Sequence, residues 1–327
     1  MNSNWKNFLL SENAIFENDT DIVFPSPEHE DSQRIYPVAH LGVLTIAGKD
    51  AAKFLQGQIT CNINDITDIK SSLGAMCNPK GRAITTFLLI KNADAFLMIL
   101  PKELLVSVKK RLQMYVLRSD VILTDSSNEL CLIGLSDSVA QSDELSEPLF
   151  KTNRQQENIV VNFQNRSLII AEADNAQKFW TEQVNQGFQP EDSAQWRYLD
   201  IISGIPWVSA ETSEEFIPQM LNLDKLGGIS FNKGCYTGQE IVARTHYLGK
   251  AKREMFLAEG ADIMPPEPNS SVIDDSTGIE QSIGKVLCAQ NRKKSCKMLI
   301  VLQLSDTNAY SLRLKNHNQD KIALSTV

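Results

Sequence analysis

One short stretch of the chain holds the side chains best suited to chemistry. Its thiol is Cys235, and Lys233 precedes that thiol by two residues. Thr237 and Glu240 have the spacing of a capping box, which predicts a helix that begins at Thr237 and stops at Gly249. A cysteine near the positive end of a helix and near a lysine has a lowered pKa, which makes its thiol reactive. The alternative is a tight loop that holds a buried, inert cysteine.

The composition is typical of an ordinary soluble protein of two or three domains. The chain has 327 residues, of which 42% are hydrophobic and 22% are charged, so it is long enough to bury a large core. The net charge of −8 gives no overall basic field that would attract nucleic acid. We therefore do not expect direct binding of tRNA.

The cysteines and the termini indicate a cytoplasmic protein. The six cysteines are scattered without a C-x-x-C pair, and the four histidines do not cluster with them. This pattern argues against a resident metal and against a disulfide scaffold, so we expect reduced thiols. The sequence contains neither a secretory signal nor an apolar run long enough to span a membrane, so no membrane partner is expected.

The predicted elements divide the chain into four parts and place it in the α+β class. Residues 1–36 form a polar N-terminal segment. Strands and helices over 37–125 predict an α+β domain, which residues 193–249 complete, and 126–192 predict a second α+β domain. Residues 250–327 contain short strands without a helical period, which predicts a C-terminal β-barrel.

The stretch around the thiol, KGCYTGQE at residues 233–240, resembles the signature of the YgfZ family. Other blocks that resemble this family are FLQGQIT at 54–60, CNPKGR at 77–82, LRSDV at 117–121, FIPQ at 216–219 and LGGISF at 226–231. These are folate-binding proteins of tRNA modification and iron–sulfur maintenance, related to the T-protein of the glycine cleavage system. The resemblance implies a T-protein-like fold, with two intertwined α+β domains and a C-terminal β-barrel around a folate-sized central cavity.

The resemblance also implies roles for individual residues. Cys235 would be the functional thiol and a possible transient ligand of iron. The residues that would act with it in the same loop are Lys233, Tyr236, Gln239 and Glu240. Trp196 matches a tryptophan that the family associates with folate, and an indole stacks well on a flat pterin. The alternative for Trp196 is a core residue. Arg82 is a further candidate for a folate contact.

Two departures from the family pattern limit the expected activity. A second family tryptophan is replaced by Leu41. The acidic groups with which the glycine-cleavage relatives hold their substrate correspond to Thr85 or Thr86, and to Ile202. None of these side chains can carry a charge, so neither aminomethyl transfer by that mechanism nor classical turnover is expected.

We therefore expect a folate-binding protein that supports the assembly or repair of iron–sulfur proteins, and thereby tRNA methylthiolation. Tetrahydrofolate or a derivative would be the ligand, and the partners would include iron–sulfur enzymes that modify tRNA. One alternative is a folate-dependent one-carbon transferase with other catalytic residues. Another is a thiol oxidoreductase, against which the missing C-x-x-C partner counts.

A basic run remains outside these assignments. Five cations and no acidic residue lie between 281 and 300, namely Lys285, Arg292, Lys293, Lys294 and Lys297. Such a run could contact tRNA phosphates or a folate polyglutamate tail. The alternative is a solvated hairpin.

Overall fold

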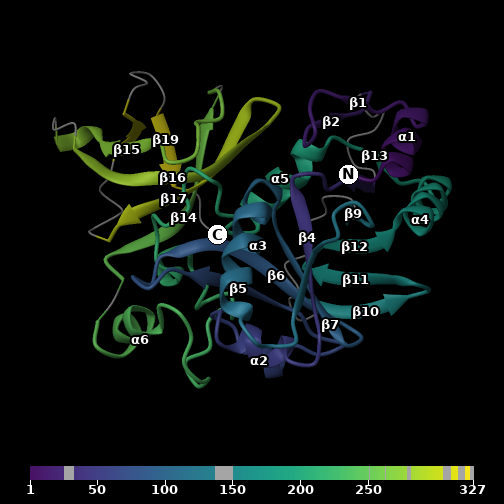
Figure 1. Ribbon diagram of the computed structural model, residues 1–327. Coiled ribbons are helices and arrows are strands. Elements are labelled where there is room, and N and C mark those ends of the chain that lie inside the picture. Colours follow the sequence, from purple (N-terminus) through teal and green to yellow (C-terminus); the bar gives the residue numbers. More distant parts are fainter. Residues whose placement is uncertain are drawn as a thin grey trace. The chain divides into compact units, whose positions relative to one another are not determined.

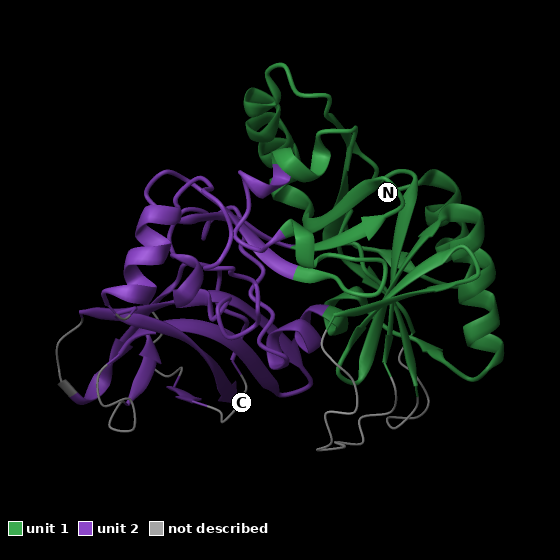
Figure 2. Ribbon diagram, turned by 90° about the horizontal axis from the view of Figure 1, so that it is seen from below, with its two compact units in different colours: residues 1–54, 63–72, 88–196 green, residues 55–62, 73–87, 197–327 purple. Residues whose placement is uncertain are grey.

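The fold is described by a computed structural model (Figure 1). It describes residues 1–25, 33–136, 150–249, 251–261, 263–277, 281–304, 311–315 and 321–324. The chain forms two compact units, coloured separately in Figure 2. Unit 1 comprises residues 1–54, 63–72 and 88–196, and unit 2 comprises residues 55–62, 73–87 and 197–327. The segments of the two units therefore alternate along the sequence.

Unit 1 contains a six-stranded sheet with the order β10-β11-β12-β9-β3-β13. Its strands are β3 (Arg34–Pro37), β9 (Leu130–Ser136), β10 (Lys151–Gln155), β11 (Asn158–Phe163), β12 (Arg166–Glu172) and β13 (Gln189–Pro190). Only β13 and β3 pair in parallel, while the other pairs described are antiparallel. One face of the sheet packs against helices α1 (Ser3–Ser11) and α4 (Ala173–Asn185).

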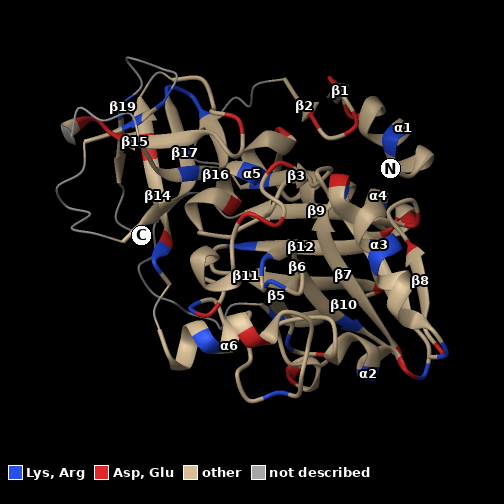
Figure 3. Cartoon of the chain, turned by 60° about the vertical axis from the view of Figure 1, so that its left-hand side comes forward, with Lys and Arg blue, Asp and Glu red and all other residues tan. Residues whose placement is uncertain are grey.

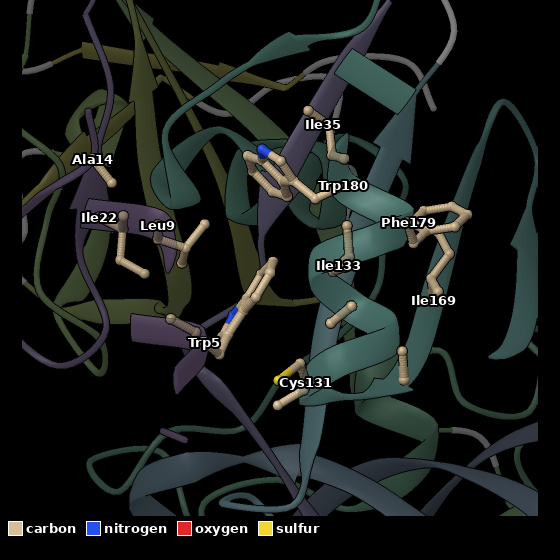
Figure 4. Close-up of a cluster of buried hydrophobic side chains, with 14 of the residues drawn as sticks. Trp5, Leu9, Ala14, Ile22, Ile35, Cys131, Ile133, Ile169, Phe179 and Trp180 are labelled. Atoms are coloured by element: carbon tan, nitrogen blue, oxygen red, sulfur yellow. The ribbon is translucent and has the colours of Figure 1, made fainter. Parts of the chain in front are cut away.

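The core beneath these helices is rich in aromatic side chains (Figure 4). Trp5 of α1 meets Trp180 of α4 edge to face, with ring centroids 5.7 Å apart. Leu9 and Ile22 are also fully buried there, although both belong to the polar N-terminal part of the sequence. A short hairpin of β1 (Ile15–Phe16) and β2 (Ile22–Val23) completes this part. The first 25 residues therefore contribute directly to the core of unit 1.

A second sheet has the strand order β5-β6-β7-β4-β8. Its strands are β4 (Leu41–Ala47), β5 (Ser72–Cys77), β6 (Ala83–Asn92), β7 (Ala95–Pro101) and β8 (Ile122–Asp125). Helix α2 (Ala51–Gln56) follows β4, and helix α3 (Lys102–Val116) packs on β4, β7 and β8. The buried face of α3 is an apolar stripe made of Leu104, Leu105, Val108, Leu112 and Val116.

The C-terminal part of unit 2 is a closed six-stranded barrel with the order β14-β17-β16-β15-β18-β19. Its strands are β14 (Arg253–Ala261), β15 (Ser271–Asp274), β16 (Ser282–Arg292), β17 (Ser295–Gln303), β18 (Leu312–Leu314) and β19 (Lys321–Leu324). Small and branched apolar side chains such as Val272, Val286 and Ile300 fill its interior. The prediction of an α+β protein with a C-terminal barrel is thus confirmed.

The remaining elements connect these layers. They are η1 (Ile63–Asp65), α5 (Ser193–Ile202), η2 (Pro218–Leu221), α6 (Gln239–Tyr247) and η3 (Asp275–Thr277). In the described ranges, none of the helices combines the length and the apolar character needed to cross a membrane.

Candidate functional site

The loop that carries Cys235 lies within unit 2 and is fastened at both ends to residues 57–61. The backbone N–H of Ser230 donates to the carbonyl of Thr60 (2.9 Å), and the N–H of Thr237 donates to the carbonyl of Gly57 (3.3 Å). The hydroxyl of Thr60 adds a third bond, to the carbonyl of Gly228 (2.6 Å). Two blocks that resemble the family, far apart in the sequence, therefore form one local structure.

Lys233 points from this loop into the protein. Its Nζ donates to the carbonyl oxygens of Ile59 (2.7 Å) and Cys61 (2.8 Å), and it lies 5.1 Å from the ring centre of Tyr236. Burial lowers the pKa of Lys233 to about 8 and raises the pKa of the buried Tyr236 hydroxyl. Lys233 is therefore close to Cys235 in the sequence, but its ammonium group is hydrogen-bonded to the backbone of residues 59 and 61.

Cys235, by contrast, is exposed. Its neighbour Gly234 is exposed too, and no atom lies within 4 Å of the position where a Cβ on Gly234 would be. Of the other cysteines, Cys288 is half-buried and four are buried, namely Cys61, Cys77, Cys131 and Cys296. Cys235 is therefore the cysteine that a macromolecular partner can reach most easily.

The predicted capping box at Thr237 is wrong. Helix α6 begins at Gln239, its N-cap is Gly238, and no side chain of the N-cap residue caps the helix. Gly238 has φ +84°, and a Cβ there would lie 2.5 Å from the carbonyl oxygen of Asn78. The close approach of that backbone requires glycine in a left-handed conformation, so it determines where the helix starts. At the other end, Leu248 is the C-cap, and the predicted stop Gly249 follows it.

Gln239 and Glu240 occupy the first turn of α6. The N–H of Gln239 donates to the carbonyl of Tyr236 (3.1 Å), which joins the loop to the helix. Glu240 is exposed in the first turn and Arg244 lies in the last turn, an arrangement of charge that favours the helix dipole (Figure 3).

Arg82 belongs to the turn that packs on Gly238. The side-chain oxygen of Asn78 accepts from the N–H groups of Lys80 (2.9 Å) and Arg82 (3.0 Å), which fixes the turn. The Arg82 guanidinium donates to the carbonyls of Glu214 (3.1 Å) and Glu215 (2.6 Å). One nitrogen of this exposed guanidinium makes both bonds.

Trp196 is a core residue of unit 1, with 1% of its surface exposed. The Arg166 guanidinium lies over its indole at 4.5 Å, and the backbone of Gly134 lies so close that a Cβ there would overlap the ring. Tyr36 and Phe163 pack beside it, at centroid distances of 5.6 and 6.2 Å. A pterin could stack on Trp196 only after Arg166 had moved. Trp196 belongs to unit 1 and Cys235 to unit 2.

Thr85 and Thr86, which stand where the glycine-cleavage relatives are expected to have an acidic group, are buried in the structure. The hydroxyl of Thr86 donates to the carbonyl of Pro206 (2.5 Å) and accepts from the N–H of Val208 (3.1 Å). Thr85 is fully buried as well. Sequence reasoning missed one nearby acid, Asp200 on α5, which is 2% exposed and accepts from the indole N–H of Trp207 (2.8 Å).

Two of the five cations of the basic run are paired with acidic residues. Lys285 pairs with Glu215 and Lys297 pairs with Glu259, each at 2.6 Å. The bond from Lys297 holds the pKa of Glu259 below its ordinary value. Within the part of the chain that the structure describes, no group of three or more His, Cys, Asp and Glu side chains could hold a metal ion.

Comparisons with known proteins place these features in context. No protein-family profile matches the chain. The chain is 28% identical over 295 residues to the tRNA-modifying protein YgfZ of Hamiltonella defensa, which covers 88% of this chain and 84% of that protein. It is 32% identical over 249 residues to the tRNA-modifying protein YgfZ of Colwellia psychrerythraea, with coverages of 74% and 76%.

A solved structure shares the fold. The glycine cleavage system aminomethyltransferase T from Bartonella henselae superposes with a TM-score of 0.70 over 91% of this chain and 86% of that one. The sequence identity is 12%, so this likeness concerns the fold alone.

Proposed function

Because the chain belongs to the YgfZ family, we propose that it supports tRNA modification and that Cys235 is its working thiol. The membership confirms the resemblance found in the sequence, and relatives of this family carry the name tRNA-modifying protein. The observation that carries the proposal is the position of Cys235, which is exposed in a loop fastened at both ends, while the other cysteines are buried or half-buried.

The finer proposal is that this thiol serves iron–sulfur enzymes that modify tRNA. A thiolate is a soft ligand that suits iron, whereas a serine hydroxyl stays protonated and binds iron poorly. One exposed thiolate offers one ligand, which suits a transient contact during assembly or repair of a cluster better than a resident cluster. The protein would then act on other proteins, and its effect on tRNA would be indirect.

Complementation tests the role of the thiol. A strain that lacks the corresponding gene should regain tRNA methylthiolation with the wild-type protein but not with Cys235→Ser, measured by mass spectrometry of tRNA nucleosides. Cys288→Ser is the matched control, since it removes a thiol elsewhere in unit 2 and should complement. Full complementation by Cys235→Ser would show that the loop does not work through its sulfur.

We also propose that tetrahydrofolate or a derivative is the ligand, as the resemblance implies, with Trp196 and Arg82 as candidate contacts. Trp196→Phe is the better test variant, because replacing a fully buried tryptophan by alanine costs about 3–5 kcal/mol of stability. Calorimetric titration with tetrahydrofolate should show weaker binding to Trp196→Phe and to Arg82→Gln than to the wild type. Unchanged affinity in both variants would place the folate elsewhere on the chain.

A second candidate function is folate-dependent one-carbon transfer. The fold shared with aminomethyltransferase T favours it. The buried hydroxyls of Thr85 and Thr86 and the apolar Ile202 count against it, because none of them can supply the carboxylate that would hold a positively charged aminomethyl intermediate. We therefore rank it below the accessory role.

A further inference from the structure

In the KGCY segment the two outer residues are turned inward and the two middle residues are exposed. Lys233 is half-buried and Tyr236 is buried, whereas Gly234 and Cys235 between them are exposed. The ends of the loop are held by backbone bonds at Ser230 and Thr237. Its middle is held by the two bonds from the Lys233 ammonium, which reach across to the segment beneath.

The two acceptors of this ammonium flank Thr60. The carbonyls of Ile59 and Cys61 belong to fully buried or nearly fully buried residues, with 0% and 2% of their surfaces exposed. Buried carbonyl oxygens need a donor, and one lysine supplies both here. The ring of Tyr236 covers the same ammonium from the loop side, at a distance that allows a cation–π contact.

We infer that Lys233 is the positioning residue of the Cys235 loop, which it holds closed through Ile59 and Cys61 so that Cys235 faces solvent. This inference rests on the proposed function in one respect: the position of Cys235 matters for function only if its thiol is the working group. It replaces the expectation that Lys233 acts on the thiol by its charge. The ammonium is committed to two carbonyls and a ring on the inner side of the loop, so its main effect is mechanical.

The tethering does not depend on the charge of the lysine. A neutral amine still carries two N–H donors, which is enough for the two carbonyl oxygens. The titratable groups that face Lys233 are Tyr236 and Cys61, and Cys77 lies next to Tyr236. A side chain of similar length without donors, such as methionine, should therefore release the loop at any pH.

Hydrogen exchange measures this release directly. In Lys233→Met the backbone amides of residues 231–236 should exchange about tenfold faster than in the wild type, because two hydrogen bonds no longer stabilise the closed loop. Lys80→Met is the matched control, since it removes an exposed lysine from the neighbouring turn and should leave this exchange unchanged. Lys233→Arg keeps the charge and the donors, and should keep exchange within about threefold of the wild type.

Alkylation of Cys235 separates the mechanical role from a role of charge. The pH at which alkylation is half-maximal should be the same in Lys233→Met and in the wild type. Unchanged exchange at 231–236, or a higher half-maximal pH in Lys233→Met, would overturn the inference. If Lys233→Met does not fold, Lys233→Arg decides, and tenfold faster exchange in that variant would overturn it as well. None of these measurements involves tRNA. The inference about Lys233 can therefore fail while the complementation test supports Cys235 as the working thiol, and the reverse.

Discussion

The backbone of Gly81 packs directly against the side chain of Ile241, so that a Cβ on Gly81 would lie 2.7 Å from the Cβ of Ile241. Gly81 also has φ +70°. Its turn and the N-terminus of α6 are in contact at a second glycine, Gly238, whose added Cβ would lie 3.0 Å from the Cα of Gly81. Two glycines thus allow the turn to support the helix that follows the Cys235 loop.

Gly81→Ala should lower the free energy of unfolding by about 1–3 kcal/mol, because the methyl group overlaps Ile241 and the positive φ strains an L residue. Urea denaturation of the variant and the wild type measures the difference. Gly234→Ala is the control, since nothing lies within 4 Å of its added Cβ. That control should change stability by less than about 0.5 kcal/mol. Equal effects of the two substitutions would contradict the packing described.

Cys235 should be the first cysteine to react with a limiting amount of iodoacetamide at pH 7. Burial raises the pKa of Cys77, of Cys131 and of the half-buried Cys288 to about 12 each, so their thiolates are scarce. Cys235 is exposed, so the reagent can reach its thiol directly. Peptide mass spectrometry after short reaction times should find the label in the peptide that contains Cys235. A label that appears first in any other peptide would refute the assignment of the reactive thiol.

Lys233 should make stability rise with pH over a defined window. Its pKa is lowered from 10.5 to about 8 in the folded protein, chiefly by burial. Between these values the unfolded chain still binds a proton that the folded protein has released, so the free energy of unfolding increases with pH.

The difference in stability between the wild type and Lys233→Met should therefore grow in favour of the wild type by about 1 kcal/mol from pH 7.5 to 9.5, after allowance for solvent screening. Urea denaturation at both pH values measures it, with Lys80→Met as the control that should show no such growth. A difference that is constant or shrinks with pH would mean that the lysine is less buried than described.

The protein should release no ammonia from an aminomethylated carrier protein in the presence of tetrahydrofolate, even when the other glycine-cleavage components are supplied. Thr86 is committed to Pro206 and Val208, and Ile202 is apolar. Asp200 is buried against Trp207. An authentic aminomethyltransferase T in the same assay is the positive control. Folate-dependent release above the background without protein would restore the one-carbon transferase as the leading function.

The sequence was sufficient for the elements whose patterns are local. The region 37–125, predicted to be α+β, contains β4, β7 and α3, and the region 250–327, predicted to hold short strands, contains the barrel strands. The start of α6 was not predictable in this way, because the conformation of Gly238 depends on Asn78, which is distant in sequence. A capping box is a local signal, and here a tertiary contact overrides it.

The candidate site shows the same limit. The thiol could be identified from its motif, and its exposure agrees with a reactive role. The direction of Lys233 could not be predicted, because its acceptors lie 174 and 172 residues away. The pairing of Lys285 with Glu215 likewise joins a barrel strand to a loop far from it in the sequence. A motif can be recognised from neighbouring residues, whereas contacts between residues far apart in the sequence depend on the complete fold.

The alternation of the two units has a consequence for synthesis on the ribosome. Every residue of unit 1 lies within the first 196 residues, so this unit can be completed while most of unit 2 has not yet been made. Residues 55–62 emerge early but belong to unit 2, and the carbonyls of Ile59 and Cys61 gain their donor only when Lys233 emerges. Pairings across such distances form slowly, and their early partners stay exposed in the meantime. A nascent chain that stalls before Lys233 is therefore expected to present a folded unit 1 with unfinished segments of unit 2, a form that chaperones and proteases recognise.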